Sequence, residues 1–405
     1  MPAPSPIART TLLLGLAQTL AWASSYYLPA VLAAPMARDL GVAASTVFAA
    51  FSVALLVSAL VGPWAGRRID RLGGRPVLMA SNAVFALALL ALAAAQGPVG
   101  LLAAWALMGV AMGSGLYEAA FATAVRLHGT EARRSITGIT LFAGFASTVG
   151  WPLSTAIELH GGWRATCMTW AGLHLLVALP LNALLATPAA GQGAAAVPTS
   201  AQGGAHGSGG GLSAAARRRA AVLMAAVFAV AWFNSTAMAA HLPMVLQASG
   251  VALAAAVGMA ALVGPAQVAG RLLEFSLLRR AHPLLSARLA SLAHPLGALL
   301  LLAGGLWAAP AFVVLHGLGN GILTIAIGTL PLWVFGAQGY GQRQGLLMVP
   351  ARLVQAGAPF LFGLAVARWG SGALVLSASL ALLALGALLW MPLAAPGGTA
   401  ASAAR

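Results

Sequence analysis

Residues 61–75 read VGPWAGRRIDRLGGR, and they join a long apolar run to a dense group of charges. The apolar run covers residues 45–65, a length that suits a helix crossing a membrane. Asp70 lies just beyond its end, where a carboxylate can cap a neighbouring helix or pair with arginines. Such contacts can break and reform during a conformational change. The stretch therefore predicts a membrane helix that ends in a polar contact point.

The whole chain has the composition of a membrane protein. Of its 405 residues 60% are hydrophobic and 7% are charged, whereas a soluble domain has roughly 25% charged residues. All 21 basic residues are arginines, and the formal net charge is +15. These arginines separate apolar blocks and do not form a solvated face with interleaved aromatic residues, so we expect no nucleic-acid partner. Cys167 is the single cysteine, which excludes an internal disulfide.

Apolar segments of about 20 residues recur along the chain, and such lengths favour helices, which satisfy their own backbone groups in lipid. The expected fold is an all-α membrane protein with twelve transmembrane helices. The predicted segments cover residues 10–33, 45–65, 77–96, 100–123, 135–157, 164–187, 220–245, 251–272, 286–308, 311–335, 346–368 and 371–393.

A stretch rich in Gly, Ala and Ser separates the sixth segment from the seventh and is typical of a flexible linker. It divides the chain into an N-terminal six-helix bundle, a cytoplasmic linker, a C-terminal six-helix bundle and a cytoplasmic tail. With both termini in the cytoplasm, most arginines lie on the cytoplasmic side, as the positive-inside rule requires. The expected boundaries are 1–187, 188–216, 217–394 and 395–405.

Two short patterns occur in both halves of the chain. AWASSYYLP, which starts at residue 21, resembles AWFNSTAMAAHLP, which starts at residue 231, and VGPWAGRRID resembles VGPAQVAGRLLE. Because each half has an even number of predicted helices, the repeats are parallel and related by an axis along the membrane normal. The paired residues are Trp22 with Trp232, Ser25 with Ser235, Gly66 with Gly270, Arg67 with Arg271 and Asp70 with Glu274.

The loop after the second segment resembles the signature GxxxD(R/K)xG(R/K)(R/K) of the major facilitator superfamily, with Gly74 in place of one basic residue. With the twelve segments, the central linker and the weaker second copy, the resemblance extends over essentially the whole chain. It implies two pseudo-symmetric six-helix bundles that transport by alternating access. The implied gating motif consists of Gly66, Arg67, Asp70, Arg71, Gly73, Arg75, Gly270, Arg271 and Glu274. The alternative is that the arginines only fix topology and bind anionic lipid headgroups.

Two departures from that family weaken an interpretation as a drug antiporter. Many of its proton-coupled antiporters carry an arginine in the fourth helix, where this chain has Trp105 ahead of Gly109. The fifth helix has Gly144, Gly150, Trp151 and Pro152 where those antiporters have a denser run of glycines.

Glu118 and Arg352 are the ionised residues expected within the spans, at similar depths of about 10 Å, since a helix rises about 1.5 Å per residue. Glu118 is a candidate proton carrier because desolvation favours the protonated form of a carboxyl group. A structural hydrogen-bonded carboxyl is the alternative. Arg352 is a candidate contact for an anionic substrate, although an arginine at that depth can also extend to the interface.

Polar and aromatic residues share single faces of several predicted helices. We expect a substrate cavity lined by Trp22, Ser25, Tyr26, Trp232, Asn234, Ser235, Met238, Asn320 and Arg352. For each residue alone, ordinary packing with hydrogen bonds across helices is the alternative. His316 is a second candidate for proton coupling, with His294 a weaker one, because histidine titrates near neutral pH.

No enzyme or primary pump is expected. The two aspartates, Asp39 and Asp70, lie outside the spans, and a chain without lysine cannot hold a Gly-Lys-Ser/Thr phosphate loop. Two histidines without nearby acids do not make a metal site. We expect no cofactor.

The sequence therefore predicts a secondary active transporter that is coupled to protons and functions as a monomer. A small organic anion such as a monocarboxylate is the expected substrate. The alternatives are efflux of neutral or cationic hydrophobic compounds and a non-transporting sensor on the same fold. The lysine-free, alanine-rich composition favours a bacterial inner membrane, with protons, the substrate and the lipid bilayer as the partners.

Overall fold

The computed structural model describes residues 5–187, 213–278 and 281–391, and in these ranges the chain forms helices and no strands. Two short π-helical segments, at His174–Ala178 and Glu274–Leu278, continue α8 and α12. The α-helices are α1 (Pro6–Ala23), α2 (Leu28–Leu40), α3 (Ala44–Leu72), α4 (Gly74–Ala94), α5 (Pro98–Gly115), α6 (Tyr117–His128), α7 (Ala132–Ala143), α8 (Ala146–Leu173), α9 (Leu179–Ala183), α10 (Ala214–Ala248), α11 (Leu253–Ala260), α12 (Val263–Leu273), α13 (Pro283–Gly304), α14 (Ala309–Phe335), α15 (Tyr340–Trp369) and α16 (Ala373–Leu389).

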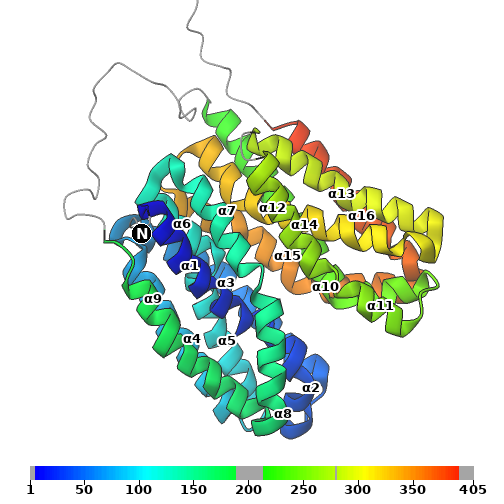
Figure 1. The fold of residues 1–405 in the computed structure, drawn as a ribbon, viewed down its shortest axis with the longest axis horizontal. Helices are drawn as coiled ribbons and strands as arrows, with labels where there is room; N and C mark the ends of the chain where they lie inside the picture. Colours follow the sequence, from blue (N-terminus) through cyan, green and yellow to red (C-terminus); the bar gives the residue numbers. More distant parts are fainter. Residues whose placement is uncertain (1–4, 188–212, 279–280, 392–405) are drawn as a thin grey trace, which may run out of the picture.

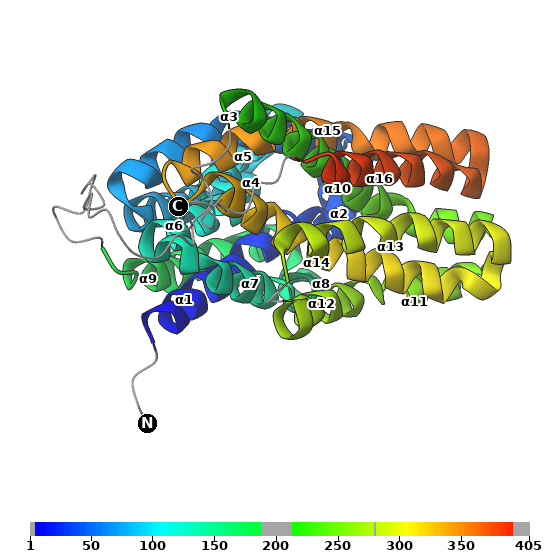
Figure 2. The same ribbon diagram turned by 90° about the horizontal axis from the view of Figure 1, so that it is seen from above.

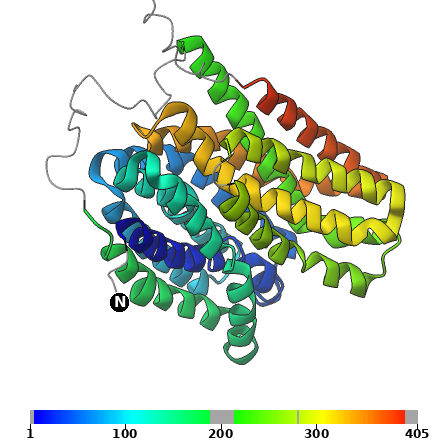
Figure 3. The same ribbon diagram turned by 45° about the horizontal axis from the view of Figure 1, so that its top comes forward.

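The helices lie in two groups, α1–α9 and α10–α16. Figure 1 shows the groups meeting at the end where α10 begins and diverging from it, with α2 and α8 far from α11. Figure 2 shows α1 and α9 on one side of the molecule and α13 and α16 on the other, and in Figure 3 the first group lies at lower left, against the second group at upper right. The groups contact each other mainly where α3 and α6 pack on α15 and where α7 packs on α12 and α14. We call the end where they meet the linker end.

Helical stretches long and apolar enough to cross a membrane number seven in the described residues. Three of them, Pro98–Ala183, Pro283–Phe335 and Tyr340–Leu389, are 86, 53 and 50 residues long, whereas one crossing takes about 20. These stretches therefore contain more than one crossing each, consistent with twelve. Large apolar side chains such as Leu60 and Leu176 lie on the surface, where lipid can cover them. The chain has the all-helical fold of a multi-pass membrane protein.

The first predicted segment, residues 10–33, is two helices with a turn at residues 24–27. The hydroxyl of Ser25 donates to the carbonyl of Ala21 at 2.5 Å. Serine side chains that bond to the backbone in this way compete with a continuous helix. Pro29 then suits the first turn of α2, where no amide donor is needed.

The fourth predicted segment, residues 100–123, is also divided. Leu116 has an extended backbone between α5 and α6, with ψ at −162°. Gln18 stabilises the break, because its side-chain amide donates to the carbonyl of Gly115 at 2.6 Å. The segment expected at 135–157 is likewise divided between α7 and α8, at Gly144 and Phe145.

Several predicted features lie wholly or partly outside the described residues. These are the linker up to residue 212 and the tail at 395–405. α10 begins at Ala214, and the hydroxyl of Ser213 caps it by accepting from the amide of Ala216 at 3.2 Å.

Candidate functional site

An ion pair joins the two groups of helices. Glu118 lies in the first turn of α6, directly after the break at Leu116, and Arg352 lies within α15. The Oε1 atom of Glu118 and the Nη2 atom of Arg352 are 2.8 Å apart, and the two side chains are 13% and 5% exposed. The helix N-terminus also favours a carboxylate at this position. The two charges predicted at similar depths are therefore partners.

A chain of hydrogen bonds continues from this pair across the interface. Arg352 donates through Nη1 to Oε1 of Gln355 at 2.9 Å, and Gln355 donates to the hydroxyl of Tyr26 at 3.3 Å. That hydroxyl also lies 3.1 Å from the hydroxyl of Thr236 on α10. Sequence analysis missed Gln355, although its spacing of three residues from Arg352 places both on one helix face.

Aromatic rings from both groups surround the ion pair. Trp22 and Trp232 are stacked, with centroids 6.0 Å apart and an interplanar angle of 1°. The ring of Tyr117 lies 4.7 Å from that of Trp22, and the guanidinium of Arg352 lies 4.8 Å from that of Trp232. The two tryptophans paired by the sequence repeat therefore meet at the interface between the two groups.

A small cavity of about 10 Å³ adjoins the ion pair. It lies between α3, α5, α6 and α15, and a cavity of this size holds about one water molecule. Its lining residues are Ser58, Ala59, Gly62, Gly113, Glu118, Gly345, Met348 and Arg352.

The other residues predicted to line the cavity lie apart from this cluster. Ser25 bonds back to its own helix, and Asn234 donates to the carbonyl of Ser377 at 3.0 Å. Met238 is buried in a core cluster of the second group. Ser235 accepts a hydrogen bond from Asn320 at 3.1 Å. The structure therefore gathers Trp22, Tyr26, Trp232 and Arg352, leaves Ser25 bonded within the first group and places Asn234, Ser235, Met238 and Asn320 within the second group.

His294 and His316 face each other inside the second group, with their Nδ1 atoms 2.9 Å apart. The hydroxyl of Ser377 donates to the carbonyl of Leu374, so it can accept from Nε2 of His294 at 3.0 Å. If Nε2 of neutral His294 carries the proton, its Nδ1 atom is an acceptor, and the Nδ1 atom of His316 donates to it. Neutral His316 then has its proton on Nδ1, so its Nε2 atom is a free acceptor. His316 lines a cavity of about 30 Å³ with Ser235 and Asn320.

The first group has a buried histidine that sequence analysis missed. His174 lies 2.8 Å from the carbonyl oxygen of the Asn82 amide and 2.7 Å from the hydroxyl of Ser24. Asn82 uses its amide nitrogen on the carbonyl of Leu78, so its oxygen accepts from His174. Both ring nitrogens are therefore satisfied, which makes His174 a packing residue.

Asp70, in the predicted gating motif, caps α15 at the linker end. Its two carboxylate oxygens each accept a backbone amide at 2.9 Å, from Gly341 and Gln342. Gly66 lies one turn away, where an added Cβ would overlap the backbone of Gly341. α3 and α15 are therefore joined both by the hydrogen bonds to the Asp70 carboxylate and by close packing of their backbones.

The remaining residues of that loop have different surroundings. Arg67 and Arg71 are exposed, and Arg75 is half-buried. Gly73 has a φ of 83°, a left-handed conformation that favours glycine, where α3 ends and α4 begins. Gly74 departs from the family signature, and an added Cβ there would overlap the side chain of Thr123.

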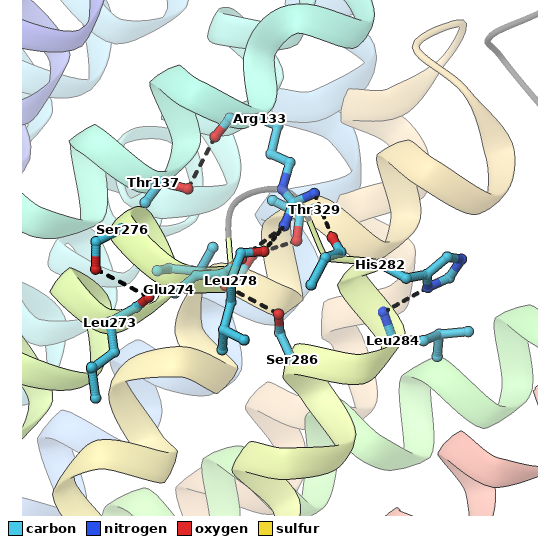
Figure 4. A network of polar contacts seen from close by, with 12 residues as sticks. Arg133, Thr137, Leu273, Glu274, Ser276, Leu278, His282, Leu284, Ser286 and Thr329 are labelled. Atoms are coloured by element: carbon cyan, nitrogen blue, oxygen red, sulfur yellow. Dashed lines mark hydrogen bonds and ion pairs between the residues drawn. The ribbon is translucent and has the colours of Figure 1, made fainter.

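Glu274 forms the corresponding contact of the second group (Figure 4). Its Oε1 accepts from Arg133 at 3.0 Å and its Oε2 accepts from Ser286 at 3.0 Å. Arg133 lies at the start of α7, so this contact also joins the groups at the linker end. Burial lowers the pKa of the nearby His282 below its usual value, as do the charges of Arg288 and Arg133.

Arg271 differs from Arg67, its partner in the repeat. It is 4% exposed, and its Nε and Nη1 atoms are buried without a hydrogen-bond partner in the described residues. Gly270 beside it packs against the backbone of Leu318 on α14. The structure therefore places Arg271 inside the helix packing, whereas Arg67 is exposed.

At the opposite end, Arg164 joins three helices of the first group. It forms an ion pair with Asp39 and donates to the carbonyls of Ala93 and Ala95 at 3.0 and 2.9 Å. The hydrogen bond from Arg164 lowers the pKa of the exposed Asp39.

Comparisons with known proteins agree with this architecture. A family model described as "Major Facilitator Superfamily" matches residues 14–349. The human organic anion transporter MFSD10 (TETRAN) has a similar structure, with 17% identity and a TM-score of 0.67 over 95% of this chain and 100% of that one. The proton:xylose symporter XylE, bound to 6-bromo-6-deoxy-D-glucose, has 12% identity and a TM-score of 0.71 over 96% of both chains.

Among curated sequences, an uncharacterized 38 kDa protein in the 23S RNA operon of Thermoproteus tenax is 32% identical over 160 residues. That match covers 39% of this chain and 41% of the relative.

Proposed function

Because this chain belongs to the major facilitator superfamily, whose members are carriers rather than enzymes, we propose that it couples the movement of a small organic anion to that of protons. The two units that rock against each other are residues 1–187 and 217–394, which expose a central site to each side in turn. The substrate class is a small carboxylate such as a monocarboxylate. The protein works as a monomer in a bacterial inner membrane.

One observation carries this proposal: the Glu118–Arg352 ion pair bridges the two units beside the stacked tryptophans. A proton on Glu118 removes its charge and weakens the pair. Arg352 then has a free donor for an anion, and charge-assisted hydrogen bonds are the strong ones. The proton and the anion together leave the site with the same net charge as the pair, so their joint binding is favoured over either alone.

The linker end is the cytoplasmic end in this proposal, and both of its contacts are formed. The cap that Asp70 forms on α15 and the ion pair between Glu274 and Arg133 hold the cytoplasmic ends of the units together. The state described here is therefore closed toward the cytoplasm, and transport requires both contacts to break.

Proteoliposomes that enclose a pH-sensitive dye test the coupling. A panel of small carboxylates is added to wild-type protein, to the Glu118→Gln variant and to the Arg368→Gln variant, in which an exposed arginine is changed. We expect a proton signal triggered by a carboxylate in the wild type and in Arg368→Gln, and its loss in Glu118→Gln. A proton signal that survives in Glu118→Gln would instead support His316, which lines a cavity, as the coupling site.

Efflux of a neutral or cationic hydrophobic compound is the second candidate, favoured by the aromatic rings around Trp22 and Trp232. Arg352 already balances the charge of Glu118, which makes the carboxylate a poor contact for a cation. A proton signal triggered by cations and absent with carboxylates would select this candidate. Binding without movement of either class would indicate a sensor.

A further inference from the structure

Arg271 carries a buried charge for which the described residues provide no hydrogen bond or ion pair. It is 4% exposed, and Nε and Nη1 both lack an acceptor. A buried charge without a partner costs several kcal/mol. The other arginine buried in a span, Arg352, differs because Glu118 and Gln355 accept from it.

The guanidinium of Arg271 extends from the last turn of α12 to the first unit, at the interface between the two units. An added Cβ at Gly144 would overlap its Nη1 atom, so the two are in contact. Gly144 follows the last residue of α7, whereas Arg133, which binds Glu274, lies at its start. Eleven residues of helix separate these points by about 16 Å. The guanidinium therefore lies beside the end of α7 that is remote from the Glu274–Arg133 contact.

The aromatic cluster adjoins this charge. Gly150, six residues after Gly144, packs against Ala23, which precedes the turn and follows Trp22 directly. The rings of Tyr27 and Tyr117 contact Trp22, with centroids 6.4 and 4.7 Å from it. The charge and the stacked tryptophans thus border one region of the interface.

The stacked tryptophans and Arg271 all have unused donors. The indole Nε1 atoms of Trp22 and Trp232 are buried without an acceptor, as are Nε and Nη1 of Arg271. Buried polar groups in native proteins almost always have partners, so unused ones indicate a missing ligand or water. Because indole and guanidinium groups donate and do not accept, they suit a ligand that only accepts, such as a carboxylate.

We propose that Arg271, with the indole groups of Trp22 and Trp232, is the receptor for the carboxylate of the substrate. This inference rests on the proposed function and deepens it, because it separates two roles. Arg271 binds the carboxylate first, and a proton on Glu118 then frees Arg352 to join the contact, so movement depends on the proton. Gly144 is part of the receptor because a side chain there would fill the place of the guanidinium.

Thermal unfolding of the purified protein in detergent tests the receptor. The probes are lactate and benzoate, each compared with its neutral amide, lactamide or benzamide. The variants are Arg271→Gln, Arg271→Lys and the exposed control Arg368→Gln. We expect both carboxylates, and neither amide, to raise the melting temperature of the wild type and of Arg368→Gln. Arg271→Gln is expected to weaken carboxylate binding by roughly 10- to 100-fold, with Arg271→Lys intermediate.

The unliganded protein provides a second measurement that separates binding from folding. Removal of an unpartnered buried charge should leave the melting temperature of Arg271→Gln equal to or above that of the wild type. A lower value would show that Arg271 supports the fold and would reject the receptor. Equal carboxylate affinity in Arg271→Gln and wild type, or no preference of the wild type for carboxylates over amides, would also reject it.

Transport assays distinguish this failure from failure of the proposed function. If Arg271→Gln binds and moves carboxylates as well as the wild type does, the receptor is wrong and carboxylate transport stands. If the wild type binds carboxylates through Arg271 but moves no protons with them, the receptor stands and the coupling is wrong.

Discussion

At the scale of single residues, the two buried arginines of the spans have opposite environments. Arg352 gives its donors to Glu118 and Gln355 and lies over the ring of Trp232. Arg271 lies against Gly144 with Nε and Nη1 unused. One arginine is therefore held by its neighbours, and the other is available to a ligand.

The buried ion pair predicts an asymmetry between single and double substitutions. Arg352→Gln leaves Glu118 without its charge partner, and breaking such a pair costs about 3–5 kcal/mol. The double variant Glu118→Gln/Arg352→Gln removes both charges and should recover most of that loss. Thermal unfolding in detergent measures both. A double variant as unstable as Arg352→Gln alone would contradict the pair as a stabilising unit.

At the scale of elements, the crossing of α3 and α15 depends on small residues. Gly66 and Gly341 bring the two backbones together, and Asp70 caps α15 beside them. Small residues permit such close approach of membrane helices. The break where α5 ends depends instead on another helix, because Gln18 of α1 donates to the carbonyl of Gly115.

Gly66→Ala should disrupt this crossing. Its Cβ would overlap the backbone of Gly341, which cannot rotate away, so we expect a cost of about 3 kcal/mol, near the upper end for overpacking. Gly62→Ala, one turn earlier on α3, is the matched control, since its Cβ would lie 3.9 Å from the backbone of Gly345. Unfolding temperatures compare the two variants. Equal temperatures would show that the backbones are not in contact at Gly66.

At the scale of the whole molecule, two related contacts hold the units together at one end. Asp70 of the first unit caps a helix of the second, and Glu274 of the second unit pairs with Arg133 of the first. The sequence repeat pairs Asp70 with Glu274, so the contacts follow the pseudo-symmetry of the fold. Together they favour the state that is closed at the linker end.

Loss of both contacts should shift the population toward a state open at that end. Asp70→Ala removes a helix cap and costs about 1 kcal/mol, so it should raise the open population about fivefold. Arg133→Gln should add to this effect. Spin labels at Leu72 and Gln338, which are exposed near the ends of α3 and α14, report the separation in a Cys167→Ser background. We expect each substitution to increase the fraction of molecules in which the two spin labels are farther apart. An unchanged distance distribution in the double variant would contradict the role of these contacts.

The sequence by itself determined the membrane class, the helical fold and the family resemblance, because partition into lipid depends on the apolar length of each local segment. It also matched Trp22 with Trp232 and Asp70 with Glu274, because the repeat preserves local patterns. Only the tertiary structure decided which charges meet. Glu118 and Arg352 are 234 residues apart in the chain, and no local pattern links them. The same holds for the break at Leu116 and for the isolation of Arg271, since both depend on side chains contributed by other helices.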